Sequence, residues 1–165
     1  MNVDLRERVR AARKADLEVV RSLLRDADLP ETGVDEALAE MVVLEDAGIV
    51  VAAAALERYD DAALLRSVVV AESRRGAGIA RAIVADRVQH AADTGARSVY
   101  LLTTTAAGFF ARLGFEAIDR GDLPRAVAGS EEFVSLCPAS AVVMRRRTGA
   151  AGSTSFENGD SDERD

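Results

Sequence analysis

The sharpest local signal in this 165-residue chain is Val68-Val69-Val70-Ala71-Glu72-Ser73-Arg74-Arg75-Gly76-Ala77-Gly78-Ile79-Ala80. An apolar β-branched run is followed by a short polar loop and then by two glycines at the start of a helical pattern. Glycines allow backbone N–H groups to approach a ligand closely, and a helix N-terminus adds partial positive charge. Two adjacent arginines add full charges, so the segment predicts a buried strand, a phosphate-binding turn and a helix. The glycines alone would also suit an ordinary strand-to-helix turn.

Two common nucleotide-binding fingerprints match this turn weakly. A dinucleotide-binding turn needs a further glycine three residues after Gly78, where this chain has the bulky, charged Arg81. A P-loop needs the sequence Gly-Lys-Ser/Thr, and the only lysine of the chain is the distant Lys14. The phosphate-binding hypothesis therefore needs a different kind of ligand.

The segments on either side of the turn alternate between strand and helix patterns. Strands are predicted at residues 6–12, 41–44, 49–59, 64–70, 99–103, 115–118 and 141–145. Helices are predicted from 16 until Pro30 and Gly33 end the pattern, at 34–39, from the glycine turn to about 94, and at 106–113. Asp16 is expected to cap the first helix, and the stretch containing Pro124 and Pro138 is expected to be irregular. This order predicts an α/β (α+β) domain with a mixed sheet and helices on its faces.

A hairpin around Asp60–Asp61 carries the candidate acid–base residues. If these two residues form the whole turn, Glu57 and Arg66 are diagonal neighbours and share one sheet face with Tyr59. The opposite face would carry Leu56, Leu65 and Val69. Glu57 is the candidate base, directly or through water, and Arg66 is the candidate partner of an acceptor anion. An ion pair on a solvated sheet face would have the same sequence pattern, and a longer turn would split the pair across two faces.

Composition excludes several classes of protein. Hydrophobic residues make up 48% and charged residues 30%, which is typical of a globular domain, and no apolar run is long enough to span a membrane. The net charge of −7 argues against nucleic-acid binding. Residues 1–14 have no apolar core of a secretory signal, and Cys137 is the only cysteine, so we expect a cytoplasmic protein without a metal site.

The distribution of charged residues also suggests where the folded domain ends and what kind of organism the protein comes from. Residues 148–165 are polar and acidic, which predicts a disordered C-terminal tail after a domain over 1–147. Of 21 basic residues only Lys14 is lysine, against 28 acidic residues. This balance is associated with salt-adapted organisms, so a halophilic source is expected.

Two motifs resemble those of one enzyme family. Arg75-Gly76-Ala77-Gly78-Ile79-Ala80 is similar to the Arg/Gln-x-x-Gly-x-Gly/Ala signature of the GNAT superfamily of acetyl-CoA-dependent N-acetyltransferases. Ala107-Gly108-Phe109-Phe110-Ala111-Arg112-Leu113-Gly114-Phe115 resembles the second hallmark, a short helix that ends in Gly-Phe. The segments at 64–67, 100–106 and 136–138 resemble the GNAT subfamily associated with arsenic-resistance operons. The resemblance implies a mostly antiparallel, twisted sheet.

The resemblance also implies where acetyl-CoA would bind. The pyrophosphate would lie on the N–H groups of residues 75–80, beside Arg74. The pantetheine would pair with the backbone of Val68, Val69 and Val70, which would also hold the acetyl oxygen. Thr104 and Phe109 would line the other side of the CoA arm. Many family members place a tyrosine acid where this chain has Phe110, which has no proton to donate.

The combined interpretation is a monomeric or homodimeric N-acetyltransferase. It would move acetyl from acetyl-CoA to a primary amine of a small-molecule acceptor in a ternary complex, with Glu57 as base and Arg66 and Tyr59 on the acceptor. Phe110 also permits a non-catalytic acyl-CoA sensor. The third alternative, acetylation of protein N-termini, would need an open groove, whereas the insertion at 120–139 suggests a lid over a small substrate.

Overall fold

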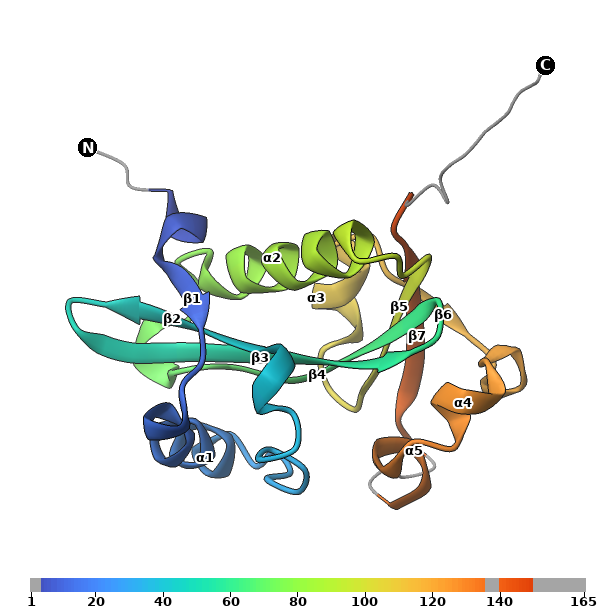
Figure 1. Ribbon diagram of the computed structural model, residues 1–165, viewed down its shortest axis with the longest axis horizontal. Helices are drawn as coiled ribbons and strands as arrows, with labels where there is room; N and C mark the ends of the chain where they lie inside the picture. Colours follow the sequence, from blue (N-terminus) through green and yellow to red (C-terminus); the bar gives the residue numbers. More distant parts are fainter. Residues whose placement is uncertain (1–3, 136–139, 150–165) are drawn as a thin grey trace. The chain divides into compact units, whose positions relative to one another are not determined.

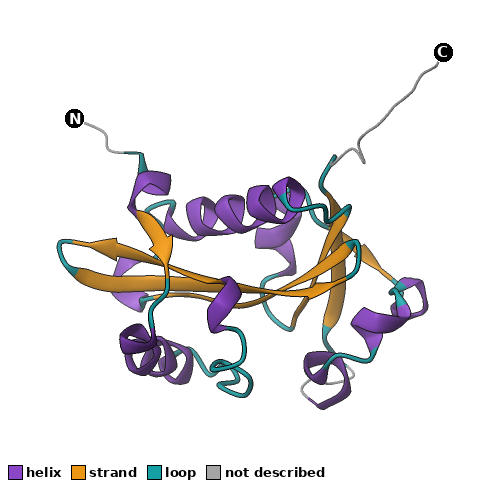
Figure 2. Cartoon of the chain, viewed as in Figure 1, coloured by secondary structure: helices purple, strands orange, loops and turns teal. Residues whose placement is uncertain are grey.

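The computed structural model describes residues 4–135 and 140–149. Figure 1 shows its strands and helices along the chain, and Figure 2 separates them by type. The strands are β1 (Val9–Ala11), β2 (Met41–Asp46), β3 (Ile49–Tyr59), β4 (Ala62–Val70), β5 (Ser98–Thr103), β6 (Glu116–Ile118) and β7 (Val142–Arg147). The α-helices are α1 (Leu17–Asp26), α2 (Ile79–Asp93), α3 (Ala107–Arg112), α4 (Arg125–Ala128) and α5 (Glu131–Ser135). Single 3-10 turns lie at Leu5–Arg8, Lys14–Asp16, Leu38–Glu40, Glu72–Arg74 and Arg120–Asp122.

The described strands form one seven-stranded sheet in the order β1-β2-β3-β4-β5-β7-β6. The pairs β1–β2, β2–β3, β5–β7 and β6–β7 are antiparallel, whereas β4 and β5 run parallel. This mixed, mostly antiparallel sheet confirms the predicted fold class. The chain divides into two compact units, Met1–Glu57 with Leu65–Arg87 and Arg58–Leu64 with Val88–Asp165.

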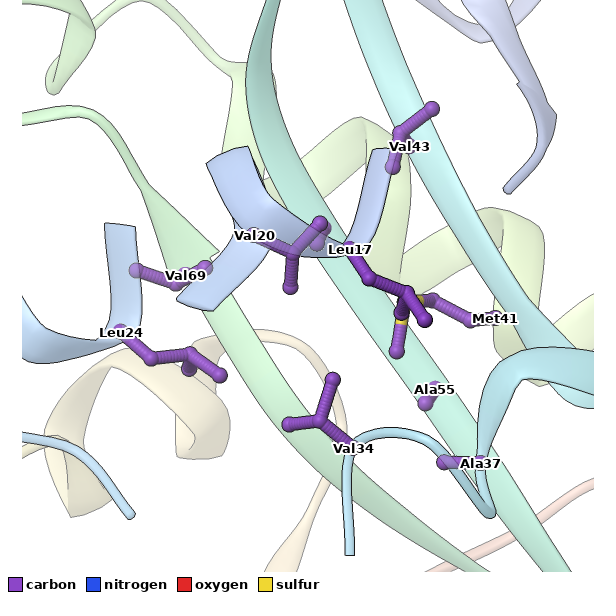
Figure 3. Packing of buried hydrophobic residues seen from close by; sticks show 10 residues of the cluster. Leu17, Val20, Leu24, Val34, Ala37, Met41, Val43, Ala55 and Val69 are labelled. Carbon is purple, nitrogen blue, oxygen red and sulfur yellow. The ribbon is translucent and has the colours of Figure 1, made fainter. Parts of the chain in front are cut away.

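The first unit has a core between α1 and one face of the sheet. In α1, Leu17, Val20 and Leu24 recur at helical spacing and are all buried. Figure 3 shows these side chains packed together with Val43 and Val69 from the strands. Figure 1 shows the first part of α2 along the other face, so helices cover both faces of this unit.

The second unit has a separate core. Tyr100 of β5 and Val143 of β7 pack with Phe133 of α5 and with Val127 of α4. Leu64, near the start of β4, joins the same cluster. Phe110 of α3 is 7% exposed, and its ring contacts the rings of Phe109 and Phe115 edge-on, with centroids 5.1 and 5.7 Å away.

Several predicted elements differ in extent. The expected strand at 6–12 begins as the 3-10 turn Leu5–Arg8, and only Val9–Ala11 pairs with β2. The expected helix at 34–39 is a turn that ends in the 3-10 turn Leu38–Glu40. The stretch expected to be irregular contains α4 and α5. These segments are short, so a few tertiary contacts outweigh their local propensities.

Asp16 lies at the expected helix boundary but bonds differently from the prediction. Its carboxylate makes no capping hydrogen bond to α1. Instead it accepts hydrogen bonds from Arg13 N at 2.7 Å and from Arg10 Nη1 at 2.8 Å. The carboxylate therefore attaches the start of α1 to β1 rather than satisfying the N–H groups of the helix.

Thr148, the first residue of the predicted tail, is hydrogen-bonded to the segment just before β5. Thr148 N donates to Arg97 O at 2.9 Å, and Thr148 Oγ1 donates to Ala96 O at 2.7 Å. Thr148 thus extends the hydrogen-bonded structure one residue beyond β7. Cys137 and residues 150–165 lie outside the described part of the chain. Within that part, none of the helices is both long and apolar enough to cross a bilayer.

Candidate functional site

The hairpin of β3 and β4 has the predicted two-residue turn, but β4 changes register after Arg66. β3 ends at Tyr59 and β4 starts at Ala62. This turn alone would place Val50 opposite Ala71, whereas Ala71 N donates to Val51 O at 2.8 Å. Ser67 has a left-handed backbone with φ 58°, which accommodates the extra residue.

The register change corrects the predicted position of Val69. An uninterrupted hairpin register predicts Val69 on the face opposite Glu57. In the structure Val69 packs against α1, together with Ala53 and Ala55. Those alanines share the face of Glu57, because side chains two residues apart in a strand point the same way. A one-residue slip at Ser67 moves every later side chain of β4 to the other face.

The turn after β4 has the backbone that its glycines suggest. Gly76 and Gly78 have φ 85° and 83°, which side-chain-bearing residues rarely adopt. The residues from Arg75 to Gly78 are exposed, and a Cβ built on Gly76 would meet nothing within 4 Å. Helix α2 begins immediately afterwards, at Ile79. The turn therefore presents accessible backbone beside a helix N-terminus, as a bound phosphate requires.

The two arginines of the turn have different partners. Arg74 Nη1 forms an ion pair with Asp46 Oδ2, and the other oxygen of Asp46 pairs with Arg8. The hydrogen bond from Arg74 is the main reason that the pKa of Asp46 is below its usual value. Arg75 is exposed, and its Nε donates to Val70 O at 3.2 Å. Arg75 is thus the more accessible positive charge.

A surface pocket of about 680 Å³ opens beside the end of β4. Val70, Ala71 and Arg75 line it on the strand side, together with Glu72 and Ser73. Leu23 and Asp26 line it from the C-terminal half of α1. Its volume is within the range of small-molecule sites. The end of the predicted strand and Arg75, the arginine of the signature, therefore border one concave surface.

Glu57 and Arg66 form the predicted pair, with very unequal burial. Arg66 Nη1 lies 2.6 Å from Glu57 Oε2, and the exposed fractions of the side chains are 2% and 23%. Arg66 Nη2 donates to Thr32 O, and Arg66 Nε donates to Ser67 Oγ at 3.2 Å. Glu57 and Arg66 are therefore not an ion pair on a solvated sheet face, because the guanidinium is enclosed and only part of the carboxylate reaches solvent. These contacts weigh against direct binding of an acceptor anion by Arg66, which stays a prediction.

The other predicted site residues belong to the second unit. Thr104 is exposed after β5, Phe109 is half-buried on α3, and Tyr59 packs against the second core. Phe110, which the family resemblance places where many members have a tyrosine, is a core residue in edge-on contact with two rings. Among the described residues, no cluster of three His, Cys, Asp or Glu side chains is arranged to hold a metal ion.

Sequence reasoning missed the residues that surround Arg66. Thr32 contributes its backbone carbonyl, and the sequence pattern predicts Gly33 only as a helix breaker. Gly33 has φ 82°, and a Cβ built on it would lie 2.7 Å from Arg66 Nη1. Its position as a lone glycine in a polar loop was the one available signal. The partner is 33 positions away in the sequence, so no local pattern reveals it.

A family model and solved structures match this arrangement. The model described as "Acetyltransferase (GNAT) domain" matches residues 37–117, from before β2 into β6. N-acetylglutamate synthase from Neisseria gonorrhoeae, solved with coenzyme A and N-acetyl-glutamate, has a TM-score of 0.76 at 19% identity over 85% of this chain. This chain spans 34% of that longer protein.

Two further structures are similar in length to this chain. Rv2747 from Mycobacterium tuberculosis, solved in complex with CoA, has a TM-score of 0.73 at 28% identity, covering 84% of this chain and 98% of that one. The ribosomal-protein-S18-alanine N-acetyltransferase of Escherichia coli has a TM-score of 0.69 at 17% identity, covering 90% and 97%. A comparison with curated protein sequences found no match. Residues 37–117 thus match an acetyltransferase domain of the GNAT family, and the fold of the chain is similar to that of the solved structures named above.

Proposed function

We propose that the protein transfers the acetyl group of acetyl-CoA to a primary amine of a small-molecule acceptor, in a ternary complex without an acetylated enzyme. The observation that carries the proposal is the turn between β4 and α2. Gly76 and Gly78 have positive φ, Arg75 is exposed beside them, and the turn lies within the matched domain. This combination suits the pyrophosphate of CoA. Solved structures of two similar proteins contain CoA, which supports the same co-substrate here.

The end of β4 supports a place for the rest of the co-substrate. The pocket lined by Val70, Ala71 and Arg75 adjoins the turn and is large enough for part of a pantetheine arm. We assign the backbone of residues 68–70 to the pantetheine and the acetyl oxygen. The turn residues Arg74, Arg75, Gly76, Ala77, Gly78, Ile79 and Ala80 are assigned to the pyrophosphate. Thr104 and Phe109 are assigned to the far side of the CoA arm.

The chemistry needs a base for the acceptor ammonium. Glu57 is 23% exposed and hydrogen-bonded to a buried guanidinium, so its carboxylate is held in one place and still reaches solvent. It would accept the ammonium proton, directly or through water. The amine nitrogen then forms a bond to the acetyl carbon, the carbon–sulfur bond breaks, and the leaving thiolate takes a proton from water. Phe110 supplies no proton, so no side chain is assigned as the acid.

A turnover screen tests the proposed function. Thiol release from acetyl-CoA would be measured with a panel of amines, including amino acids and amine-bearing arsenicals, at low and high salt. Acceleration by a small amine supports the proposal. Arsenicals as the best acceptors would support the link to arsenic resistance. Binding of acetyl-CoA without acceleration by any amine would instead favour a sensor, and acceleration only by peptides would favour protein N-terminal acetylation.

With an accepted amine, Glu57→Gln tests the base. We expect kcat to fall by about 100-fold, because a positioned base contributes that much to proton transfer. The Kd for acetyl-CoA should change less than twofold, since the carboxylate is not assigned to the co-substrate. The control is Glu45→Gln on β2, which also removes a carboxylate paired with an arginine, at 2.8 Å from Arg10. Full activity of Glu57→Gln would leave this carboxylate with a structural role only.

A further inference from the structure

We propose that Arg66 is a positioning residue, which fixes the carboxylate of Glu57 and the loop of residues 27–38 in one arrangement that only a glycine at position 33 permits. The inference rests on the proposed role of Glu57 as the base. It assigns Arg66 an indirect role, in place of direct binding of an acceptor anion.

The contacts of Arg66 connect three segments of the first unit. Nη1 donates to Glu57 on β3, Nη2 donates to the carbonyl of Thr32 in the loop, and Nε donates to Ser67 within β4. The side chain is 2% exposed, so these hydrogen bonds do not compete with bulk water. A guanidinium has a planar set of donors and can hold three acceptors in fixed directions. Movement of any one segment therefore disturbs the other two.

The loop is attached to α1 by contacts of a different kind. Arg25 forms two hydrogen bonds of 3.1 Å with Glu31, and Arg21 pairs with Asp35. These side chains lie toward solvent, where such pairs contribute little. Val34 of the same loop is 1% exposed and packs in the first core, as Figure 3 shows. The outer contacts and the core side chain hold the loop near α1, whereas Arg66 connects the backbone of the loop to Glu57.

Gly33 leaves the space that the guanidinium occupies. An added Cβ would lie 2.7 Å from Nη1, 3.2 Å from Nη2 and 3.3 Å from Cζ of Arg66. The end of an arginine usually moves aside easily, but this one is buried and hydrogen-bonded on three sides. Relief of the overlap must therefore displace either the guanidinium from Glu57 or the loop from the guanidinium.

Gly48 offers a matched control for Gly33. Its φ is 81°, against 82° at Gly33, so an alanine meets the same backbone penalty at both positions. A Cβ on Gly48, however, meets nothing within 4 Å. The difference between Gly33→Ala and Gly48→Ala therefore isolates the displacement of Arg66.

The first experiment compares these two variants by turnover and by amide hydrogen exchange. Gly33→Ala should lower kcat by about 10-fold to 100-fold, as expected for a misplaced reacting group, and leave the Kd for acetyl-CoA within twofold. Exchange should rise at the amides of Val34 and Ala37, which donate to Glu31 O and Gly33 O within the loop. Gly48→Ala should leave kcat, the Kd for acetyl-CoA and the exchange of these two amides unchanged. Equal behaviour of the two variants would overturn the proposal.

The second experiment replaces the guanidinium of Arg66 itself. It still tests the proposal if the Gly33→Ala variant folds poorly. Arg66→Lys keeps the charge but cannot serve three acceptors together, so kcat should fall while the KM for the acceptor stays within threefold. Arg25→Met also detaches a guanidinium from the loop, at Glu31, and should leave kcat unchanged. A raised acceptor KM with full kcat in Arg66→Lys would instead show direct binding of the acceptor and overturn the proposal.

The exchange measurement needs no substrate, so the two proposals can fail separately. If no amine is acetylated, the proposed function fails, and the comparison of Val34 and Ala37 exchange still decides whether Arg66 holds the loop. If an amine is acetylated but Gly33→Ala matches Gly48→Ala in both turnover and exchange, only the positioning role fails.

Discussion

Arg66 and Arg10 each hold a carboxylate from another segment. The arginine is the more buried partner in the first pair, and the carboxylate is the more buried partner in the second. Arg66 is 2% exposed and its partner Glu57 is 23% exposed. In the second pair, Arg10 is 28% exposed and Asp16 only 11%. The enclosed member of each pair depends most on its partner, because a buried charge without compensation is costly. The Glu57 carboxylate therefore keeps the solvent access that the proposed base needs, whereas the Asp16 carboxylate is largely enclosed.

Asp16 makes stability depend on pH in a defined range. The hydrogen bonds from Arg10, and then that from Arg13 N, lower its pKa from 3.8 to about 2. Because the folded pKa lies below the unfolded one, this stabilisation is complete above about pH 4 and is lost as the pH falls towards 2. Asp16→Asn should lower the free energy of unfolding at pH 7 by about 2 kcal/mol, measured by urea denaturation.

The same measurement at lower pH distinguishes this charge effect from a general packing defect. The difference between wild type and Asp16→Asn should shrink steadily as the pH falls below about 4, since the Asp16 carboxylate of the unfolded wild-type chain is protonated first and that of the folded chain only near pH 2. Glu18→Gln, at an exposed position in the first turn of α1, should stay within about 0.5 kcal/mol of wild type throughout. A pH-independent loss in Asp16→Asn would contradict the explanation.

At the scale of elements, the start of α2 is the part of the proposed site that is most sensitive to a single substitution. Gly78 O accepts the first helical hydrogen bond, from Ala82 N at 3.1 Å, so Gly78 occupies the N-cap position. Gly78→Asp would place a carboxylate beside the N–H groups that are assigned to the pyrophosphate. It would repel the phosphates and accept hydrogen bonds from the same donors. Acetyl-CoA binding should therefore be lost, as measured by calorimetric titration.

The backbone penalty of this substitution needs its own control. Gly48→Asp has nearly the same positive φ and introduces the same charge, but it lies in the turn between β2 and β3. Both variants should lose similar stability, and Gly48→Asp should keep the wild-type Kd for acetyl-CoA within about threefold. A folded Gly78→Asp protein that binds acetyl-CoA normally would remove the glycine turn as the proposed phosphate site.

The sequence predicted the long elements because their signals are local. β3 has the predicted ends, and the helix after the glycine turn ends near Gly95, whose φ is 102°. The two-residue turn at Asp60–Asp61 brought Glu57 and Arg66 together as expected. The slip at Ser67 was missed because serine rarely adopts a left-handed backbone, so nothing in its neighbourhood indicates one.

The surroundings of the candidate site were less predictable than its residues. Arg74 was predicted to face a phosphate, and its pairing with Asp46 depends on where the β2–β3 turn lies. Arg66 was predicted at a sheet face, and its burial depends on a loop over 30 residues away in the chain. Such contacts depend on tertiary packing, which cannot be predicted from hydrophobic periodicity or from turn residues.

At the scale of the whole molecule, the acidity of the chain is concentrated at one end. The net charge is −7, and residues 150–165 hold five carboxylates against one arginine. Removal of these residues would leave a net charge of −3 on the rest of the chain, as the sequence shows. The overall charge thus says little about the predicted co-substrate turn, which carries Arg74 and Arg75 with a single carboxylate, Glu72, in the preceding loop.

Two truncations test where the folded domain ends. A chain that stops at Gly149 should keep the wild-type melting temperature within about 2 °C and the same acetyl-CoA affinity, because residues 150–165 are predicted to contribute no core. A chain that stops at Arg147 loses the hydrogen bonds that Thr148 donates to Arg97 O and Ala96 O. At about 1 kcal/mol each, their loss should lower the melting temperature by several degrees in calorimetry. Equal melting temperatures for the two truncations would place the end of the domain at Arg147, and a large loss on removing 150–165 alone would contradict the predicted disordered tail.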